Sequence, residues 1–167
     1  VAPFAGCVFG SGNAAATGLD STRNSTATVN IVGGHIYENV YGGANTSIVY
    51  GATYTNIGTK AVNMTGLKVN DLIIDGTVFG GGESNAEGKE EYDFDFKSVI
   101  GSIDINIDGT GYIPSKLSFQ LTGSIFGSGN ASSSEGTSRI TVKKLGEKDK
   151  PSRNLSFQRT DILTIDN

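Results

Sequence analysis

Few residues of this 167-residue chain have the types and spacing that catalysis requires. His35 is the only histidine, and it stands between Gly34 and Ile36. A nucleophilic triad needs a histidine beside one particular serine and one acid, but spacing singles out none of the many serines. The Gly-Ser-Gly strings at 10–12 and 127–129 lack the lysine and the following helix of a phosphate-binding loop. We therefore expect no enzymatic activity and no cofactor.

The most informative polar segment, 90–96, alternates aromatic and acidic residues. As a strand it would present its aromatic rings on one face and its aspartates on the other. Its candidate contact residues are Glu90, Glu91, Tyr92, Phe94 and Phe96. Because protein interfaces favour tyrosine and phenylalanine as anchors, this segment could bind a protein partner; alternatively, its aromatics cap one end of the core. Its acids lack the spacing of a calcium loop, so we predict no metal site.

A second candidate surface consists of Tyr54, Asp104 and Arg139, which occupy equivalent places in copies of one repeated motif. If the copies stack, these side chains share an outward column with Thr28. A flat, polar face of this kind can bind a protein without rearrangement. It could equally be solvated surface. Asp104 next to Arg139 is also the nearest approach in this chain to a polysaccharide-recognising groove, the alternative function considered below.

Four copies of a glycine string set the spacing of the elements that carry these residues. They are Phe9-Gly10-Ser11-Gly12-Asn13, Tyr41-Gly42-Gly43-Ala44-Asn45, Phe79-Gly80-Gly81-Gly82 leading to Asn85, and Phe126-Gly127-Ser128-Gly129-Asn130. Upstream of the strings, one apolar column contains Val8, Val40, Val78 and Ile125, and another, four residues earlier, contains Phe4, Ile36, Ile74 and Leu121. This self-similarity predicts a stack of repeated units with buried columns. The recurring glycines are expected to serve turns that need positive φ.

A second motif follows each glycine string and alternates as a strand does. Its copies are 27–31, 53–57, 103–107 and 138–142. Period-two patterning predicts one buried face. The inward column would be Val29, Thr55, Ile105 and Ile140, and the outward column Asn30, Asn56, Asn106 and Thr141. A third similarity, between Leu117-Ser118-Phe119-Gln120 and Leu155-Ser156-Phe157-Gln158, predicts that the period continues into the last segment.

These patterns predict one all-β domain over 1–167, a parallel β-helix or solenoid-like stack of about four units. Variable segments at 14–26, 86–97 and 131–137 follow the strings, so loops should emerge on one side. Because the string spacing is irregular, a meandering sandwich or an antiparallel repeat is the alternative fold. The chain begins at Val1 and starts and ends inside a unit, which suggests a fragment of a longer protein.

Composition narrows the classes of partner that this chain could bind. A formal net charge of −4 argues against binding to nucleic acid or to an anionic membrane, both of which need clustered positive charge. No apolar stretch approaches the ~20 residues that span a bilayer, so we expect no membrane insertion. Cys7 is the only cysteine, which excludes an internal disulfide. It aligns with Asn39, Thr77 and Ser124 and reads as a serine-like replacement without chemistry.

The strings Val-Tyr-Gly-Gly-Ala-Asn at 40–45 and Ile-Phe-Gly-Ser-Gly-Asn at 125–130, with the ending over 155–167, resemble the repeats of large secreted or wall-anchored proteins of gut Firmicutes. The resemblance implies an extracellular, adhesin-like module. Some members of this group, the superantigen-like immunoglobulin-binding proteins of commensal clostridia, bind heavy-chain variable domains. We therefore expect a non-catalytic module that binds a host protein, most specifically immunoglobulin. A carbohydrate-active β-helix, either lyase or glycan-binding module, and a structural spacer are the alternatives.

Overall fold

A computed structural model describes residues 4–63, 66, 70–83, 96–112, 117, 119–143, 157–158 and 162–166. These residues form strands and turns arranged in several sheets, without a helix among them. Every pair of neighbouring strands in these sheets is parallel. The all-β prediction is confirmed, and parallel pairing rules out the antiparallel repeat.

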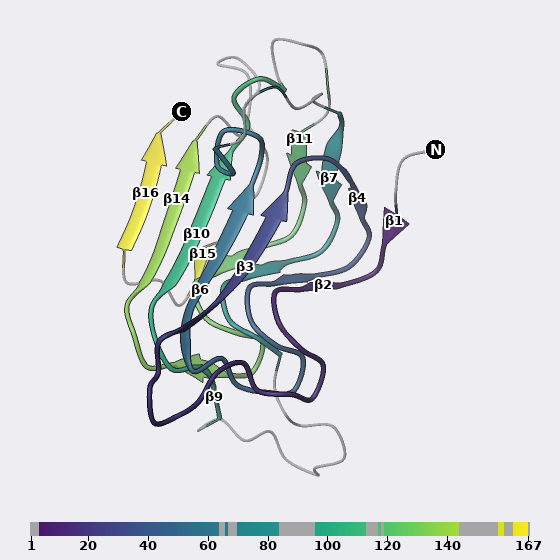
Figure 1. Cartoon of the computed structure of the whole chain (residues 1–167). Coiled ribbons are helices and arrows are strands. Elements are labelled where there is room, and N and C mark those ends of the chain that lie inside the picture. Colours follow the sequence, from purple (N-terminus) through teal and green to yellow (C-terminus); the bar gives the residue numbers. More distant parts are fainter. Residues whose placement is uncertain are drawn as a thin grey trace.

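Five strands form a long sheet that carries the repeated strand motif (Figure 1). From one edge to the other they are β3 (Ser25–Ile31), β6 (Gly51–Ile57), β10 (Ile103–Asp108), β14 (Ser138–Lys143) and β16 (Ile162–Asp166). Their register is the predicted one, because Thr55 lies beside Val29 and Ile105, and Ile105 beside Ile140. This inward column is buried, and the alternate residues of the strands face outward. The predicted two-faced strand is confirmed.

Two further sheets stack the segments upstream of the long strands. The aromatic sheet contains β2 (Val8–Phe9), β5 (Val40–Tyr41), β8 (Val78–Phe79), β12 (Ile125–Phe126) and β15 (Phe157–Gln158). The side sheet contains β1 (Phe4–Ala5), β4 (Gly34–Ile36), β7 (Leu72–Ile74) and β11 (Phe119–Leu121). The predicted column from Val8 to Ile125 is in register; Val40, Val78 and Ile125 are buried, and Val8 at the end of the stack is half-buried.

A fourth line of pairing runs through the segments that follow the glycine strings. β9 (Lys97–Val99) and β13 (Ser133–Ser134) form a two-stranded sheet, and single bridges join Val99 to Val49 and Val49 to Thr17. Val49 and Val99 are fully buried. These segments are therefore only partly loops. Successive units visit the side sheet, the aromatic sheet, this line of bridges and the long sheet in the same order.

Two expected alignments are wrong at the ends of the chain. Ala5, not Phe4, pairs with Ile36, because the first corner holds two residues, 6–7, where the later corners hold three. Phe157 pairs with Ile125 rather than continuing the Phe119 column. The short connection from β15 to β16 explains this second shift: it lets the alternating stretch 162–166 form five pairs with β14.

The expected role of the string glycines is also wrong. Among the residues that the structure describes, the glycines with positive φ are Gly18, Gly34, Gly51, Gly58, Gly66 and Gly111, none of which belongs to a glycine string. A Cβ atom on Gly42 would instead lie 2.3 Å from the carbonyl oxygen of Gly80, and one on Gly10 would lie 2.3 Å from the carbonyl oxygen of Gly42. Positions such as Gly10 and Gly42 lack a side chain because the backbones of successive units approach closely there.

Excursions leave the stack at both ends of the long strands, not at one point of the repeat as expected (Figure 1). The connection from the long sheet to the side sheet is 32–33 in the first unit but 58–71 and 109–118 in the next two. Tyr112 of the last of these is fully buried, and its ring lies 4.9 Å from that of Phe119. Its hydroxyl donates to the Val32 carbonyl at 2.8 Å and accepts the Thr59 amide at 3.2 Å. One side chain thus closes this end of the core across three connections.

Candidate functional site

The outward side of β3, β6, β10 and β14, here called the polar face, carries one of the two predicted surfaces. Period-two alternation buries the odd members of the motif and turns the even members to solvent. Because all four strands are parallel and in register, residues at the same position of each motif copy form a straight column across the sheet. The first column is Thr28, Tyr54, Asp104 and Arg139, as predicted.

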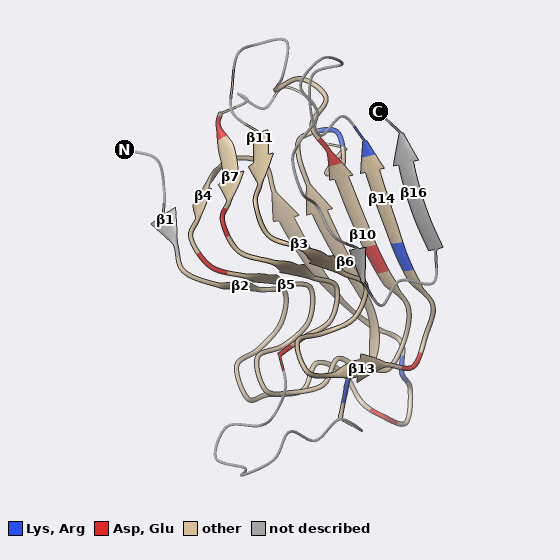
Figure 2. Ribbon diagram, turned by 180° about the vertical axis from the view of Figure 1, so that it is seen from behind, with Lys and Arg blue, Asp and Glu red and all other residues tan. Residues whose placement is uncertain are grey.

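An ion pair orders the charged end of this column. Arg139 Nη1 donates to Asp104 Oδ1 at 3.0 Å, across neighbouring strands. Figure 2 shows the acidic segment of β10 beside the basic segment of β14. The Arg139 side chain is 50% exposed, so the pair itself stabilises the fold only modestly. Only one guanidinium N–H is used in this pair, and a guanidinium has five, so Arg139 retains donors for a partner.

The neighbouring column is a ladder of side-chain amides. Asn106 Nδ2 donates to Asn56 Oδ1 at 3.1 Å, and Asn56 Nδ2 donates to Asn30 Oδ1 at 2.9 Å. Thr141 continues the column on β14. Hydrogen bonding between side chains fixes their rotamers before any partner arrives. The polar face is therefore a pre-ordered surface of hydroxyl, amide, aromatic and charged groups.

The other predicted surface lies almost entirely outside the described residues. Glu90, Glu91, Tyr92 and Phe94 are among the residues that the structure does not describe, so their roles stay predictions. Phe96 is half-buried immediately before β9, and its carbonyl accepts the Ser133 amide at 2.9 Å. It directly precedes the two-stranded sheet, whereas Tyr54, Asp104 and Arg139 belong to the long sheet.

Sequence reasoning missed a polar cluster at the corner between the side and aromatic sheets. The Cys7 thiol donates to Glu38 Oε2 at 3.0 Å. Burial, and then the Glu38 hydrogen bond, raise the pKa of Cys7, so the thiol carries little of the nucleophilic thiolate near neutral pH. Tyr41 donates its hydroxyl proton to Glu83 Oε1 at 3.3 Å, and burial raises the pKa of Tyr41 to about 12.

Glu83 also corrects one member of the glycine strings. Single parallel bridges pair Asn13 with Asn45 and Glu83 with Asn130, so Glu83, and not Asn85, is the third member of the asparagine column. Asn45 Nδ2 donates to Asn13 Oδ1 at 2.9 Å, which makes this column a second amide ladder. In the other three strings the asparagine is the fifth residue, counted from the aromatic residue. Counting five residues from Phe79 gives Glu83 without a gap, so the sequence could have identified it.

His35 lies on the outer side of the side sheet, next to a carboxylate. Its Nε2 lies 2.6 Å from Asp75 Oδ2, and its ring lies 4.0 Å from that of the exposed Tyr37. A histidine and an acid are two parts of a triad. Among the described residues, no serine or cysteine is hydrogen-bonded to His35.

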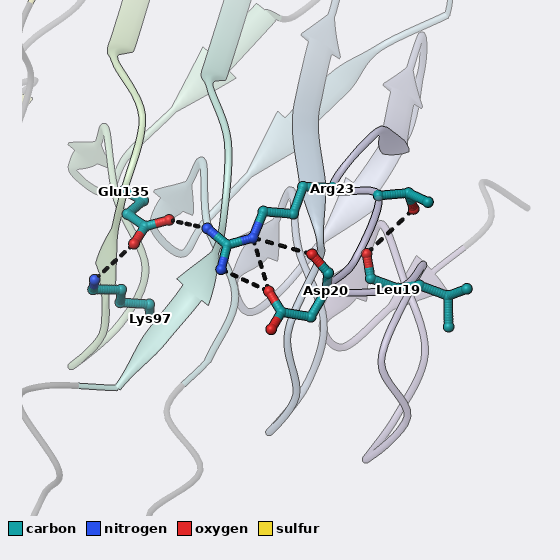
Figure 3. A network of polar contacts seen from close by, with 6 residues as sticks. Leu19, Asp20, Arg23, Lys97 and Glu135 are labelled. Carbon is teal, nitrogen blue, oxygen red and sulfur yellow. Dashed lines mark hydrogen bonds and ion pairs between the residues drawn. The ribbon is translucent and has the colours of Figure 1, made fainter.

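A network of charged side chains connects the first unit with the third and fourth units (Figure 3). Arg23 pairs with Asp20 at 2.7 Å and with Glu135 at 3.0 Å, and Lys97 pairs with the same Glu135 at 3.0 Å. The Lys97 hydrogen bond and its charge, assisted by Arg23, lower the pKa of Glu135. The excursion 18–24 of the first unit is thereby tied to the fourth unit.

Comparison with protein-family models, with curated proteins and with solved structures found no match to this chain. The described part of the chain contains no helix that is long and apolar enough to cross a membrane. Within the same residues, no group of three or more histidine, cysteine, aspartate or glutamate side chains converges as a metal site would. The family resemblance of the sequence therefore stays an expectation, and function is argued from the polar face.

Proposed function

We propose that this chain is a β-solenoid module of a secreted or wall-anchored bacterial protein, and that it binds a host protein without catalysing a reaction. The solenoid interpretation is supported by parallel strands that recur in the same order in successive units. Stacked units need one another to bury their inner faces, which makes the surface that they share rigid. Rigid surfaces bind with little ordering cost.

The single observation that carries the binding proposal is the pre-ordered polar face. Its amide ladder and the Asp104–Arg139 pair hold polar groups in fixed positions, and Tyr54 adds an aromatic ring beside Asp104 in the same column. Tyrosine and arginine are among the residue types that most often dominate binding energy at protein interfaces. A folded protein with a complementary flat surface is the partner that such a face would recognise.

Immunoglobulin is the most specific partner that we propose. The choice among host proteins rests on the resemblance of the repeats to the immunoglobulin-binding group, and the polar face is compatible with a heavy-chain variable domain of complementary charge. In this proposal Tyr54 anchors the partner, and Arg139 contributes charge-assisted hydrogen bonds. Asp104 holds the guanidinium in position.

The test is retention of purified immunoglobulins of several heavy-chain variable families, and of serum proteins, on the immobilised chain. We expect Tyr54→Ala and Arg139→Ala each to weaken binding by on the order of 2 kcal/mol, about 30-fold in Kd. Gln120→Ala is the matched control, because Gln120 is exposed on the side sheet.

Three outcomes would contradict this proposal in different ways. Retention of no protein would reject host-protein binding. Normal binding by both variants, with loss in Tyr92→Ala/Phe94→Ala, would move the contact to the 90–96 segment. Binding on a glycan array, without retention of any protein, would favour the carbohydrate alternative.

A further inference from the structure

The excursion 18–24 of the first unit is a compact loop with contacts of its own. Its two ends touch, because a Cβ atom on Gly18 would collide with the hydroxyl of Ser25. Gly18 has a φ of 85°, a left-handed conformation that glycine adopts without steric cost. Inside the loop, Arg23 Nε donates to the carbonyl of Asp20 at 3.2 Å and to its carboxylate at 2.8 Å. These contacts give the loop a defined shape, as in other compact surface loops whose ends lie close together.

One side chain of this loop reaches a distant unit (Figure 3). Arg23 Nη1 donates to Glu135 Oε2 at 3.0 Å, and Glu135 directly follows β13 of the fourth unit. The other carboxylate oxygen of Glu135 accepts from Lys97 of the third unit, also at 3.0 Å. Units of a solenoid ordinarily contact only their neighbours. The loop of the first unit therefore makes a contact that passes over the second and third units.

This contact is accessible to solvent, whereas the segments on either side of the loop are held by backbone pairing. The side chains of Arg23, Glu135 and Lys97 are 50%, 41% and 45% exposed. Exposed ion pairs shift an equilibrium by only a few fold, and dissolved salt screens them. The amides of Thr17 and Ser25, by contrast, donate to backbone carbonyls of the second unit at 2.9 and 3.1 Å. The loop can therefore leave Glu135 while the strands stay paired.

We propose that the Arg23–Glu135 pair is a salt-sensitive clasp, through which the loop 18–24 exchanges between a closed state tied to the fourth unit and an open state, while the stack stays folded. Such local opening is expected where few contacts hold a segment. The closed clasp ties the first unit to the fourth and restricts bending of the stack on this side. In the open state, units on this side are held by their neighbours alone. The clasp contains no residue of the polar face and does not depend on the proposed function.

The rate of trypsin cleavage after Arg23 measures the population of the open state, because a protease acts on the opened form of a folded segment. Cleavage after Lys60, an exposed residue of the connection 58–71, is measured in the same digests by mass spectrometry and corrects for effects of salt on trypsin itself. Glu135→Gln removes the charge of the clasp and keeps a side chain of similar shape. We expect it to increase the corrected cleavage rate after Arg23 by about 2–5-fold.

Salt and a matched variant separate the clasp from general effects of charge. Raising the salt concentration from about 0.05 M to about 0.5 M should increase cleavage after Arg23 in the wild type by a similar factor and leave Glu135→Gln nearly unchanged. The control Glu38→Gln removes an exposed carboxylate at a corner outside this network and should cleave as the wild type does. Thermal melts should place the Tm of Glu135→Gln within about 2 °C of the wild type, since the stack itself is not altered.

Equal rates of cleavage after Arg23 in the wild type and in Glu135→Gln at low salt would overturn the proposal. So would wild-type cleavage that does not respond to salt, or an increase in Glu38→Gln as large as that in Glu135→Gln. Faster cleavage accompanied by a drop in Tm well beyond about 2 °C would also overturn it, because the opening would then be unfolding of the stack.

Discussion

Replacing Gly42 by alanine tests whether close backbone approach is the reason for the glycine strings. The φ of Gly42 is not positive, so alanine can adopt its backbone conformation. At an unhindered position of this kind, alanine stabilises a protein by about 0.4–1 kcal/mol because it restricts the unfolded chain. The new Cβ would, however, lie 2.3 Å from the Gly80 carbonyl oxygen and 2.6 Å from Thr55 Oγ1. Ordinary contact is about 1 Å longer.

The expected loss follows from the contacts that must move. Separating the second and third units at this point weakens the hydrogen bonds from Gly42 N to Phe79 O, 2.8 Å, and from Gly43 N to Gly81 O, 3.1 Å. Each is worth about 1 kcal/mol, and overpacking costs about 1–3 kcal/mol. After subtracting the stabilisation that alanine gains by restricting the unfolded chain, we expect a net destabilisation of about 3 kcal/mol. For a chain of this size, that lowers the Tm by roughly 6–12 °C.

Urea unfolding and thermal melts, followed by circular dichroism, measure this difference. The matched control is Gly6→Ala, because the nearest atom to a Cβ there is Glu38 Oε2 at 3.6 Å and the φ of Gly6 is also not positive. Gly6→Ala should change the free energy of unfolding by less than about 0.5 kcal/mol or increase it slightly. A Gly42→Ala variant as stable as the control would show that close approach is not why these positions lack side chains.

Three further predictions concern buried groups. Val78→Asp should prevent folding, because Val78 is 1% exposed and the carboxylate would have no partner. The control Val8→Asp changes a half-buried residue of the same column and should still fold. Circular dichroism distinguishes the folded variant from the unfolded one. Tyr112→Phe should lower the free energy of unfolding by about 1–3 kcal/mol in urea titrations, since the Val32 carbonyl loses its donor; an unchanged value would contradict the bridge. Tyr41 should keep its proton to about pH 12 in ultraviolet titration; because its pKa is raised on folding, the associated stability is present below pH 10 and lost as the pH rises through 12. Titration of all tyrosines near pH 10 would refute this.

Local patterning predicted the long sheet because its information lies within each strand. Alternation over 27–31 and its copies determines which side chains face inward, and the shared pattern determines the register between copies. The candidate residues Tyr54, Asp104 and Arg139 could therefore be assigned to one column from sequence. A slip of one residue would turn every apolar side chain to solvent, so few other registers compete.

The alignments failed where fixed spacing was assumed across corners. A corner can lose a residue, as at 6–7, and β16 can follow β15 after only three residues, without any mark in the local pattern. In both places the pairing partner belongs to another unit, so only the tertiary structure shows which residues pair.

The sequence by itself determined that the chain is a repeat of strands with one buried face, because periodicity is a property of neighbouring residues. Only the tertiary structure determined why the strings contain glycine, since the atoms that a Cβ would meet belong to the next unit. Contacts between residues far apart in the chain, such as Tyr112 with Val32 and Arg23 with Glu135, likewise required the stack. The two residues of each contact belong to different units, and no local sequence pattern indicates which excursions lie next to each other.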